Sequence, residues 1–164
     1  MPGTKQSVTI VTRVIGLDTL RGSVDAKAMF KEHNLEAGAK GSPDVDPHWK
    51  RYYALEEQGM LLIIGMFAVQ DSKVDVMIGY SINFLMEHMH YQTVRVCQND
   101  LVFVHPLWRS RHGLGRRLIH ETESLARGRG AVRIFFHSAP GGALEHVLPR
   151  MSYEVQETIY TRAL

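Results

Sequence analysis

The chain has 164 residues, of which 45% are hydrophobic, and its formal net charge at pH 7 is +2. This composition is typical of a folded globular protein, so it argues against a disordered chain and against a protein built to bind nucleic acid. Cys97 is the single cysteine, which excludes an internal disulfide, and the longest apolar run, residues 60–69, is too short to cross a bilayer. We therefore expect one domain over residues 1–164, located in the cytoplasm, with no membrane or nucleic-acid partner.

The first third of the chain has the pattern of one strand followed by helices. Residues 7–15 are rich in β-branched side chains, which favour a strand. Residues 18–33 are expected to be helical, with Asp18 as a candidate helix cap and the stronger helical pattern at 25–33. A further helix is expected from Asp46 and Pro47 to Gly59, because aspartate followed by proline typically opens a helix and glycine often ends one.

The remainder of the chain is dominated by predicted strands. Apolar runs bounded by turn residues predict strands at 60–69, 74–86, 93–104, 131–137 and 153–161. Helices are expected over 113–127 and 142–148. The resulting order, βααβββαβαβ, predicts an α/β (α+β) fold, a layered arrangement of mixed helices and strands.

Residues 101–118, LVFVHPLWRSRHGLGRRL, combine a buried strand, a basic turn and two glycines that open a helix. Pro106 ends the strand, because proline cannot donate to a sheet ladder. Gly113 and Gly115 permit close approach of backbone N–H groups to a ligand, and the first N–H groups of the helix have no partner within it. Nearby arginines add positive charge: Arg109, Arg111, Arg116 and Arg117. Together these features predict a phosphate cradle.

Other ligand-binding motifs match the same loop less well. The dinucleotide-binding fingerprint requires a third glycine, and Leu118 stands in its place. A Walker-type loop is excluded, because no Gly-Lys-Ser/Thr sequence is present there. A structural turn with solvated arginines remains as the alternative without a ligand.

The order of elements, with PLWRSRHGLGRRLI after a buried strand, resembles the GNAT-type N-acetyltransferases. It is most similar to the short acetyltransferase-like proteins encoded by bacteriophages. The resemblance implies a mixed, mostly antiparallel sheet with helices on both faces. It also implies that acetyl-coenzyme A, as co-substrate, lies between the strand before the glycine loop and the strand after its helix.

Carried onto this sequence, the resemblance assigns coenzyme contacts to the strand, to the loop and to a serine beyond the next strand. The expected contacts are Val102, Phe103, Val104, Arg109, Ser110, Arg111, His112, Gly113, Leu114, Gly115, Arg116 and Ser138. The loop departs from the family pattern by one extra residue, with Ser110 where Gln or Arg is usual. The tyrosine that often protonates the leaving thiol is also missing, because Leu148 stands near its expected position.

Candidate groups for the acceptor amine come from the segment before the third consecutive strand and from that strand itself. Glu87, His90 and Asp100 are the candidate catalytic bases, since carboxylates and histidines accept protons near neutral pH. His88 and Tyr91 are expected to contribute to the acceptor pocket. The pair His90-Tyr91 is favoured as its lining, because the phage-type relatives carry a similar His-Tyr pair in this segment. No metal is expected, because the histidines lack the spacing of a ligand set.

Two functions of different classes remain open. The first is an acyl-coenzyme A-dependent N-acetyltransferase, in which a primary amine of unknown identity attacks acetyl-coenzyme A directly. The second is a catalytically inactive binding or structural protein with the same fold, for example a component of a phage particle. A homodimer and a particle component both fit the sequence, and a phage-encoded protein would reside in the host cytoplasm or the virion.

Overall fold

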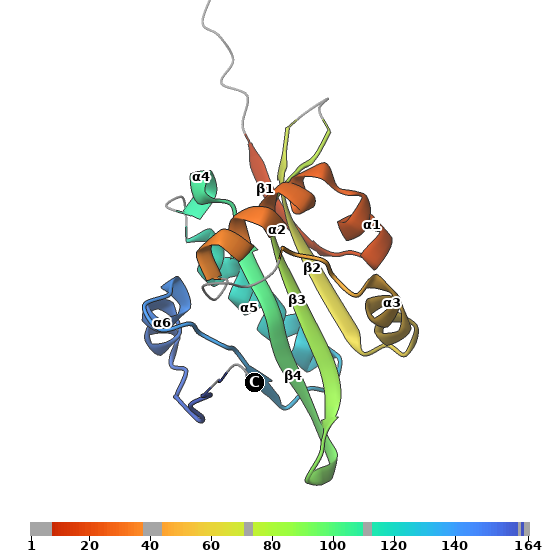
Figure 1. Ribbon diagram of the computed structural model, residues 1–164, viewed down its shortest axis with the longest axis vertical. Helices are drawn as coiled ribbons and strands as arrows, with labels where there is room; N and C mark the ends of the chain where they lie inside the picture. The colour runs from red at the N-terminus through yellow and green to blue at the C-terminus, as the bar shows by residue number, and fades with distance from the viewer. Residues whose placement is uncertain (1–7, 38–43, 71–73, 110–112, 161, 163–164) are drawn as a thin grey trace, which may run out of the picture.

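A five-stranded mixed sheet forms the centre of the protein (Figure 1), with the strands in the order β1–β2–β3–β4–β5. The computed structural model describes residues 8–37, 44–70, 74–109, 113–160 and 162. The strands are β1 (Thr9–Val14), β2 (Leu61–Val69), β3 (Val76–His88), β4 (Tyr91–Val104) and β5 (Arg133–Phe135). The first four are antiparallel neighbours, and β5 pairs with β4 in parallel.

Helices cover both faces of the sheet, as the sequence predicted. Figure 1 shows α2 in front of the sheet and α5 behind it. The helices are α1 (Leu17–Gly22), α2 (Val24–Ala37), α3 (Trp49–Glu57), α4 (Pro106–Arg109), α5 (Leu114–Gly128) and α6 (Ala143–Val147), followed by the 3-10 turn η1 (Pro149–Met151). This arrangement confirms the mixed α/β fold with a mostly antiparallel sheet.

Two hydrophobic cores lie on the two faces of the sheet. β2 is apolar throughout, so its alternating side chains contribute to both: Leu61 and Ile63 pack with α1 and α2, and Leu62 and Ile64 pack with α5. The spacing that predicted α5 is confirmed, because Leu114, Leu118 and Thr122 are all buried. Burial on both faces fixes the register of the central strands.

A β-bulge interrupts β4 at Asp100. Asn83 of β3 pairs with Asn99 and Ile82 pairs with Leu101, which leaves Asp100 without a partner residue. The Asn99 amide Nδ2 donates to the carbonyls of Ile82 at 3.3 Å and Leu101 at 3.1 Å. The side chain before the bulge therefore fastens the backbone on both sides of it.

Some sequence-based boundaries are wrong. Residues 153–160 form no strand, and the apolar side chains of Val155, Ile159 and Tyr160 are exposed there; residue 161 lies outside the described residues. An apolar pattern becomes a strand only beside an available sheet edge, and β5 offers just three residues. The segment from 106 to 109 forms the short helix α4 rather than a turn.

Candidate functional site

β4 and β5 separate at the middle of β4. The parallel pairing runs from Val96 to Gln98 on β4, opposite Arg133 to Phe135. Beyond Gln98, β4 continues to Val104 with β3 as its one recorded strand neighbour. At the point of separation, Gln98 Nε2 lies 3.0 Å from His137 Nε2, within reach for the amide to donate to a neutral imidazole. The second half of β4 therefore presents a strand edge without a strand partner among the described residues.

The start of α5 follows directly from this strand. Gly113 is the N-cap residue with φ 63°, a left-handed conformation that glycine adopts without strain. A Cβ atom built at Gly113 or at Gly115 would meet no other atom within 4 Å. Leu114 between them is 2% exposed and anchors the helix start in the core. The start of α5 thus has open space around its two glycines and is packed into the core through Leu114.

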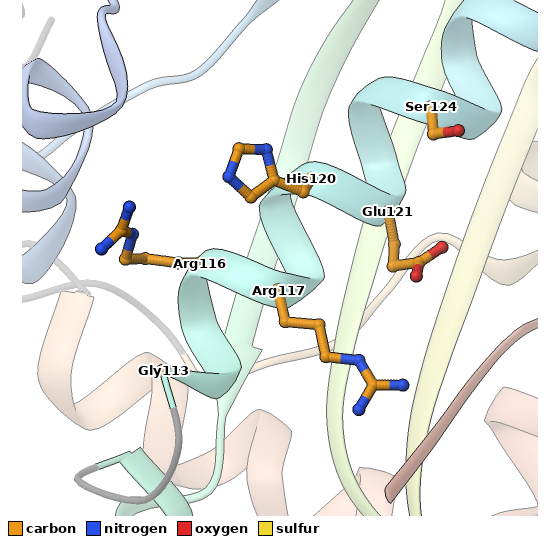
Figure 2. A pocket seen from close by; sticks show the side chains of 6 residues that line it. All are labelled: Gly113, Arg116, Arg117, His120, Glu121 and Ser124. Carbon is orange, nitrogen blue, oxygen red and sulfur yellow. The ribbon is translucent and has the colours of Figure 1, made fainter.

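A hollow of about 460 Å³ lies along the first turns of α5. Figure 2 shows Arg116 and His120 extending to one side of the helix, with Arg117 and Glu121 extending to the other. The lining residues are Gly113, Arg116, Arg117, His120, Glu121 and Ser124. Both arginines lie within the first turn, where the helix dipole also favours an anion.

Arg109 is held at the end of β4. Its Nε donates to the Val104 carbonyl at 2.7 Å, and an Nη nitrogen lies 2.8 Å from the Glu36 carboxylate. Its guanidinium carbon is 4.6 Å from the centre of the Phe103 ring. The structure therefore places Arg109 in contacts that join β4 to α2. Ser110, Arg111 and His112 lie outside the described residues, so their coenzyme contacts stay predictions.

Asp100 projects from the bulge of β4, two residues beyond the last residue that pairs with β5. The Tyr52 hydroxyl of α3 donates to its Oδ2 at 2.7 Å. Burial, reinforced by this hydrogen bond and by the charge of Asp100, raises the pKa of Tyr52. The Tyr52 hydroxyl therefore stays protonated, and the hydrogen bond that it donates orients the Asp100 carboxylate.

A cavity of about 250 Å³ lies on the same face as Tyr52. α1, α2, α3 and the segment before α3 contribute to it, and β3 and β4 complete the wall. The lining residues are Leu17, Leu20, Phe30, Val45, Asp46, Pro47, Trp49, Tyr52, Ile82, Asp100 and Leu101. The sequence did not reveal this cavity, because its residues come from separate parts of the chain.

The histidine-rich segment predicted to line the acceptor pocket is a tight hairpin between β3 and β4. β3 ends at His88 and β4 begins at Tyr91, with the two rings 4.8 Å apart. Figure 1 shows this hairpin at the lower end of the sheet and α4 at the upper end. His90 and Asp100 lie ten residues apart along the chain, a separation on the order of 30 Å in extended strand. The structure therefore does not bring His90 and Asp100 into one site.

The same separation applies to the other residues of that segment. Glu87 of β3 pairs with Arg95 of β4 near the hairpin, at the end of the sheet remote from the first turn of α5. His105 follows the far end of β4 from His88 and lies 3.9 Å from Glu32 of α2. Among the described residues, no group of three or more histidine, cysteine or acidic side chains could hold a metal ion.

A buried pair that the sequence did not reveal lies under α2. His33 Nδ1 is 3.1 Å from the Tyr80 hydroxyl, and the His33 ring stacks 4.9 Å from Phe103. Burial lowers the pKa of His33, and burial raises the pKa of Tyr80. The two side chains share a hydrogen bond whose direction depends on the His33 tautomer, and this contact ties α2 to β3. α2 gave no sequence signal for it, because partners 47 residues apart meet only in the fold.

Three further residues are relevant to the chemistry around β4 and β5: Cys97, Tyr153 and Ser138. Cys97 is fully buried, and burial raises its pKa to about 11, so the reactive thiolate is scarce at neutral pH. Tyr153 donates its hydroxyl proton to Glu123 at 2.5 Å and packs edge-on against Phe136. Ser138 is exposed beyond β5, with its hydroxyl 3.4 Å from the Ala139 carbonyl. Cys97 is thus unsuited to act as a nucleophile.

The architecture is the GNAT acetyltransferase fold, as solved structures show. A predicted acetyltransferase from Clostridium acetobutylicum, solved with acetyl-CoA, superposes with a TM-score of 0.70 at 13% identity, covering 94% of this chain and 96% of that one. A ribosomal-protein-alanine N-acetyltransferase from Brucella melitensis gives 0.69 at 14% identity, covering 95% and 98%. An aminoglycoside acetyltransferase from an uncultured soil metagenomic sample, in complex with trehalose, gives 0.69 at 13% identity, covering 94% and 96%.

The sequence itself shows no similarity of this kind. No family model matches the chain, and no curated protein matches it. The similarity to bacteriophage proteins therefore stays a prediction. In the described part of the chain, no helix has the length and apolar character needed to cross a membrane.

Proposed function

We propose that this protein is an acyl-coenzyme A-dependent N-acetyltransferase that transfers the acetyl group of acetyl-coenzyme A to a primary amine. The observation that carries the proposal is the separation of β4 from β5 beside the glycine-rich start of α5. The same fold occurs in a solved acetyltransferase with acetyl-CoA bound. A strand edge without a partner and an accessible helix start are the two features that an extended, phosphate-bearing thioester requires.

The residues around this opening suit the coenzyme. In our proposal the edge of Val102, Phe103 and Val104 accompanies its pantetheine arm, whose amides match the hydrogen-bonding pattern of a strand. The N–H groups from Gly113 to Gly115 bind the pyrophosphate, and Arg116 adds charge. We also assign coenzyme contacts to Ser110, Arg111 and His112, which precede Gly113 in the sequence, and to Ser138, which follows β5. Arg109 instead supports the end of β4 through its contact with the Val104 carbonyl.

Asp100 is the group we propose as the base. The amine nitrogen attacks the thioester carbonyl carbon, so that a C–N bond forms and the C–S electron pair leaves on sulfur. The acceptor enters as an ammonium ion and loses two protons, one to Asp100 and the other, through water, to the departing thiolate. Tyr52 holds the Asp100 carboxylate in place, and orientation of this kind supplies much of the rate in such transfers.

A pair of glycine substitutions tests the coenzyme site. Gly115→Ala and Gly128→Ala place the same methyl group at the two ends of α5, and neither added Cβ atom meets another atom within 4 Å. Alanine favours a helix over glycine by up to about 1 kcal/mol, so neither change should destabilise the protein. We expect Gly115→Ala to weaken acetyl-coenzyme A binding at least about tenfold in calorimetric titration, because the methyl group occupies the space where the coenzyme approaches.

Gly128→Ala is the control variant and should bind acetyl-coenzyme A like the unsubstituted protein. Unchanged affinity in Gly115→Ala would show that the loop is not the site, and absence of binding in the unsubstituted protein would remove the proposal altogether.

The second candidate function is a binding protein without turnover. It is favoured by the residue near the expected tyrosine position, Leu148, which is buried and has no proton to donate. Tyr153 is the tyrosine nearest to Leu148 in sequence, and its hydroxyl donates a hydrogen bond to Glu123. Tight binding of acetyl-coenzyme A without thiol release for any amine in a broad panel would favour this alternative.

A further inference from the structure

We propose that the acceptor is a small primary amine carried on an aromatic or similarly compact apolar ring, bound in the cavity of about 250 Å³ that ends at Asp100. This inference rests on the proposed function for its chemistry, because the acetyl group would arrive along β4. The cavity is present in the protein without coenzyme, so ligand binding to it can be tested separately from acetyl transfer.

The walls of the cavity are mostly apolar. Leu17, Leu20 and Ile82 line it and are each no more than 2% exposed, so they form a fixed hydrophobic surface. Trp49 and Tyr52 add aromatic rings whose centres are 6.1 Å apart. Hydroxyl groups of a sugar buried against such walls would lose their hydrogen bonds to water without replacement, which is unfavourable. The lining therefore favours a ring that presents carbon rather than oxygen.

The charges of the cavity are of one sign. Asp46 and Asp100 are the charged side chains among the described residues that line it. Two carboxylates and an aromatic wall make a site for one ammonium group on an apolar body. Asp100 defines the reacting end, because it lies where β4 separates from β5 and is oriented by the Tyr52 hydroxyl.

The size of the cavity limits the acceptor further. Pockets for drug-sized ligands measure about 300–1,000 Å³, so this cavity suits a smaller molecule. A polycationic aminoglycoside would need several separated acidic groups and more room. A single-ring amine fills the available space and meets Asp100 with its one ammonium group.

Calorimetric titration of three probes into the protein without coenzyme tests the inference: 2-phenylethylamine, 2-phenylethanol and glucosamine. The first two differ only in the ammonium group, and the first and third share an amine but differ in the ring. We expect 2-phenylethylamine to bind at least about tenfold more tightly than either of the others, since the alcohol lacks the ammonium group that pairs with Asp100 and the sugar lacks the apolar ring.

Variants assign the binding to this cavity. Asp100→Asn should remove most of the preference for the amine over the alcohol, and Trp49→Ala should weaken 2-phenylethylamine at least about tenfold. Asp46→Asn, at an exposed position, should weaken the amine by about threefold and leaves the fold intact. Tyr160→Ala, which removes an aromatic ring that is 90% exposed, should change nothing.

The outcomes separate this inference from the proposed function. Equal or tighter binding of glucosamine, or insensitivity of 2-phenylethylamine to all three cavity variants, overturns the assignment of the acceptor class. Binding of 2-phenylethylamine as expected, but without thiol release from acetyl-coenzyme A for it or for any other amine of the panel, supports the cavity as a binding site and overturns acetyl transfer.

Discussion

At the scale of single residues, Asp100 combines exposure with a fixed orientation. The bulge removes its partner on β3, so its side chain is free of the sheet, and the Tyr52 hydroxyl holds one oxygen at 2.7 Å. The second carboxylate oxygen remains available to a ligand. An exposed acid would normally sample many rotamers, and this contact limits them.

We predict that Asp100→Asn lowers kcat for acetyl transfer at least about a hundredfold with little change in acetyl-coenzyme A affinity. The amide can still accept from Tyr52 but cannot take the proton of the amine, and general-base catalysis contributes about a hundred- to ten-thousandfold. The measurement is steady-state thiol release over a range of pH. Tyr52→Phe, which keeps the carboxylate and removes its donor, should have a smaller effect.

The sequence-based alternative places the base at His90. If His90→Ala abolished thiol release while Asp100→Asn did not, our assignment of the base would be wrong. The hairpin that carries His90 lies at the far end of β4, so the two variants probe separate regions of the molecule.

At the scale of elements, β4 depends on a buried polar cluster. Asn99 Nδ2 lies within 3.3 Å of four acceptors on β3 and β4, including Asn83 Oδ1 at 2.8 Å. Thr122 of α5 donates to Ser81 at 3.0 Å or to the Leu118 carbonyl at 2.8 Å. All four polar side chains of this cluster are buried. The cluster fastens α5 and the bulge to the same point of the sheet.

We predict that Asn99→Leu lowers the free energy of unfolding by about 2–4 kcal/mol, because it leaves buried acceptors on both strands without their donor. Thr122→Val, nearly equal in shape, should cost only about 1 kcal/mol, since Ser81 retains its contacts with Asn83 and Asn99. Equilibrium unfolding in urea measures both changes. A loss for Asn99→Leu no larger than that for Thr122→Val would show that the cluster does not secure the bulge.

At the scale of the whole molecule, β1 to β4 pair as continuous neighbours, whereas β4 and β5 separate after a short stretch of pairing. β2 and β3 are buried between the helices on both faces, whereas β5 is joined to β4 through only three residue pairs. The two candidate binding regions lie on opposite faces of β4. The coenzyme would meet the start of α5, and the acceptor would enter beside α1, α2 and α3.

We predict that saturating acetyl-coenzyme A slows amide hydrogen exchange in residues 113–118 and 133–138 and leaves the hairpin at 88–91 unchanged. A ligand between the separated strands shields both of its walls and stabilises the folded state through its affinity. Exchange followed by mass spectrometry measures this. Protection confined to the hairpin would contradict the proposed coenzyme site.

The sequence by itself determined the helix and strand periods, the glycine-rich start of α5 and the order of elements that defines the fold. These are local features, because apolar spacing, proline and glycine act within a few residues of the chain. It also pointed to Asp100 as a candidate base. It overestimated the C-terminal strand, since no local pattern reports whether a sheet edge is available.

Only the tertiary structure decided which of the candidate groups belong together. Tyr52 and Asp100 are 48 residues apart in sequence, and His33 and Tyr80 are 47 apart, yet each pair is in hydrogen-bond contact. Conversely, His90 and Asp100 are near in sequence and far apart in space, because a strand extends by about 3.3 Å per residue. Pairing across a sheet thus brings distant residues together, and extension along a strand separates near ones.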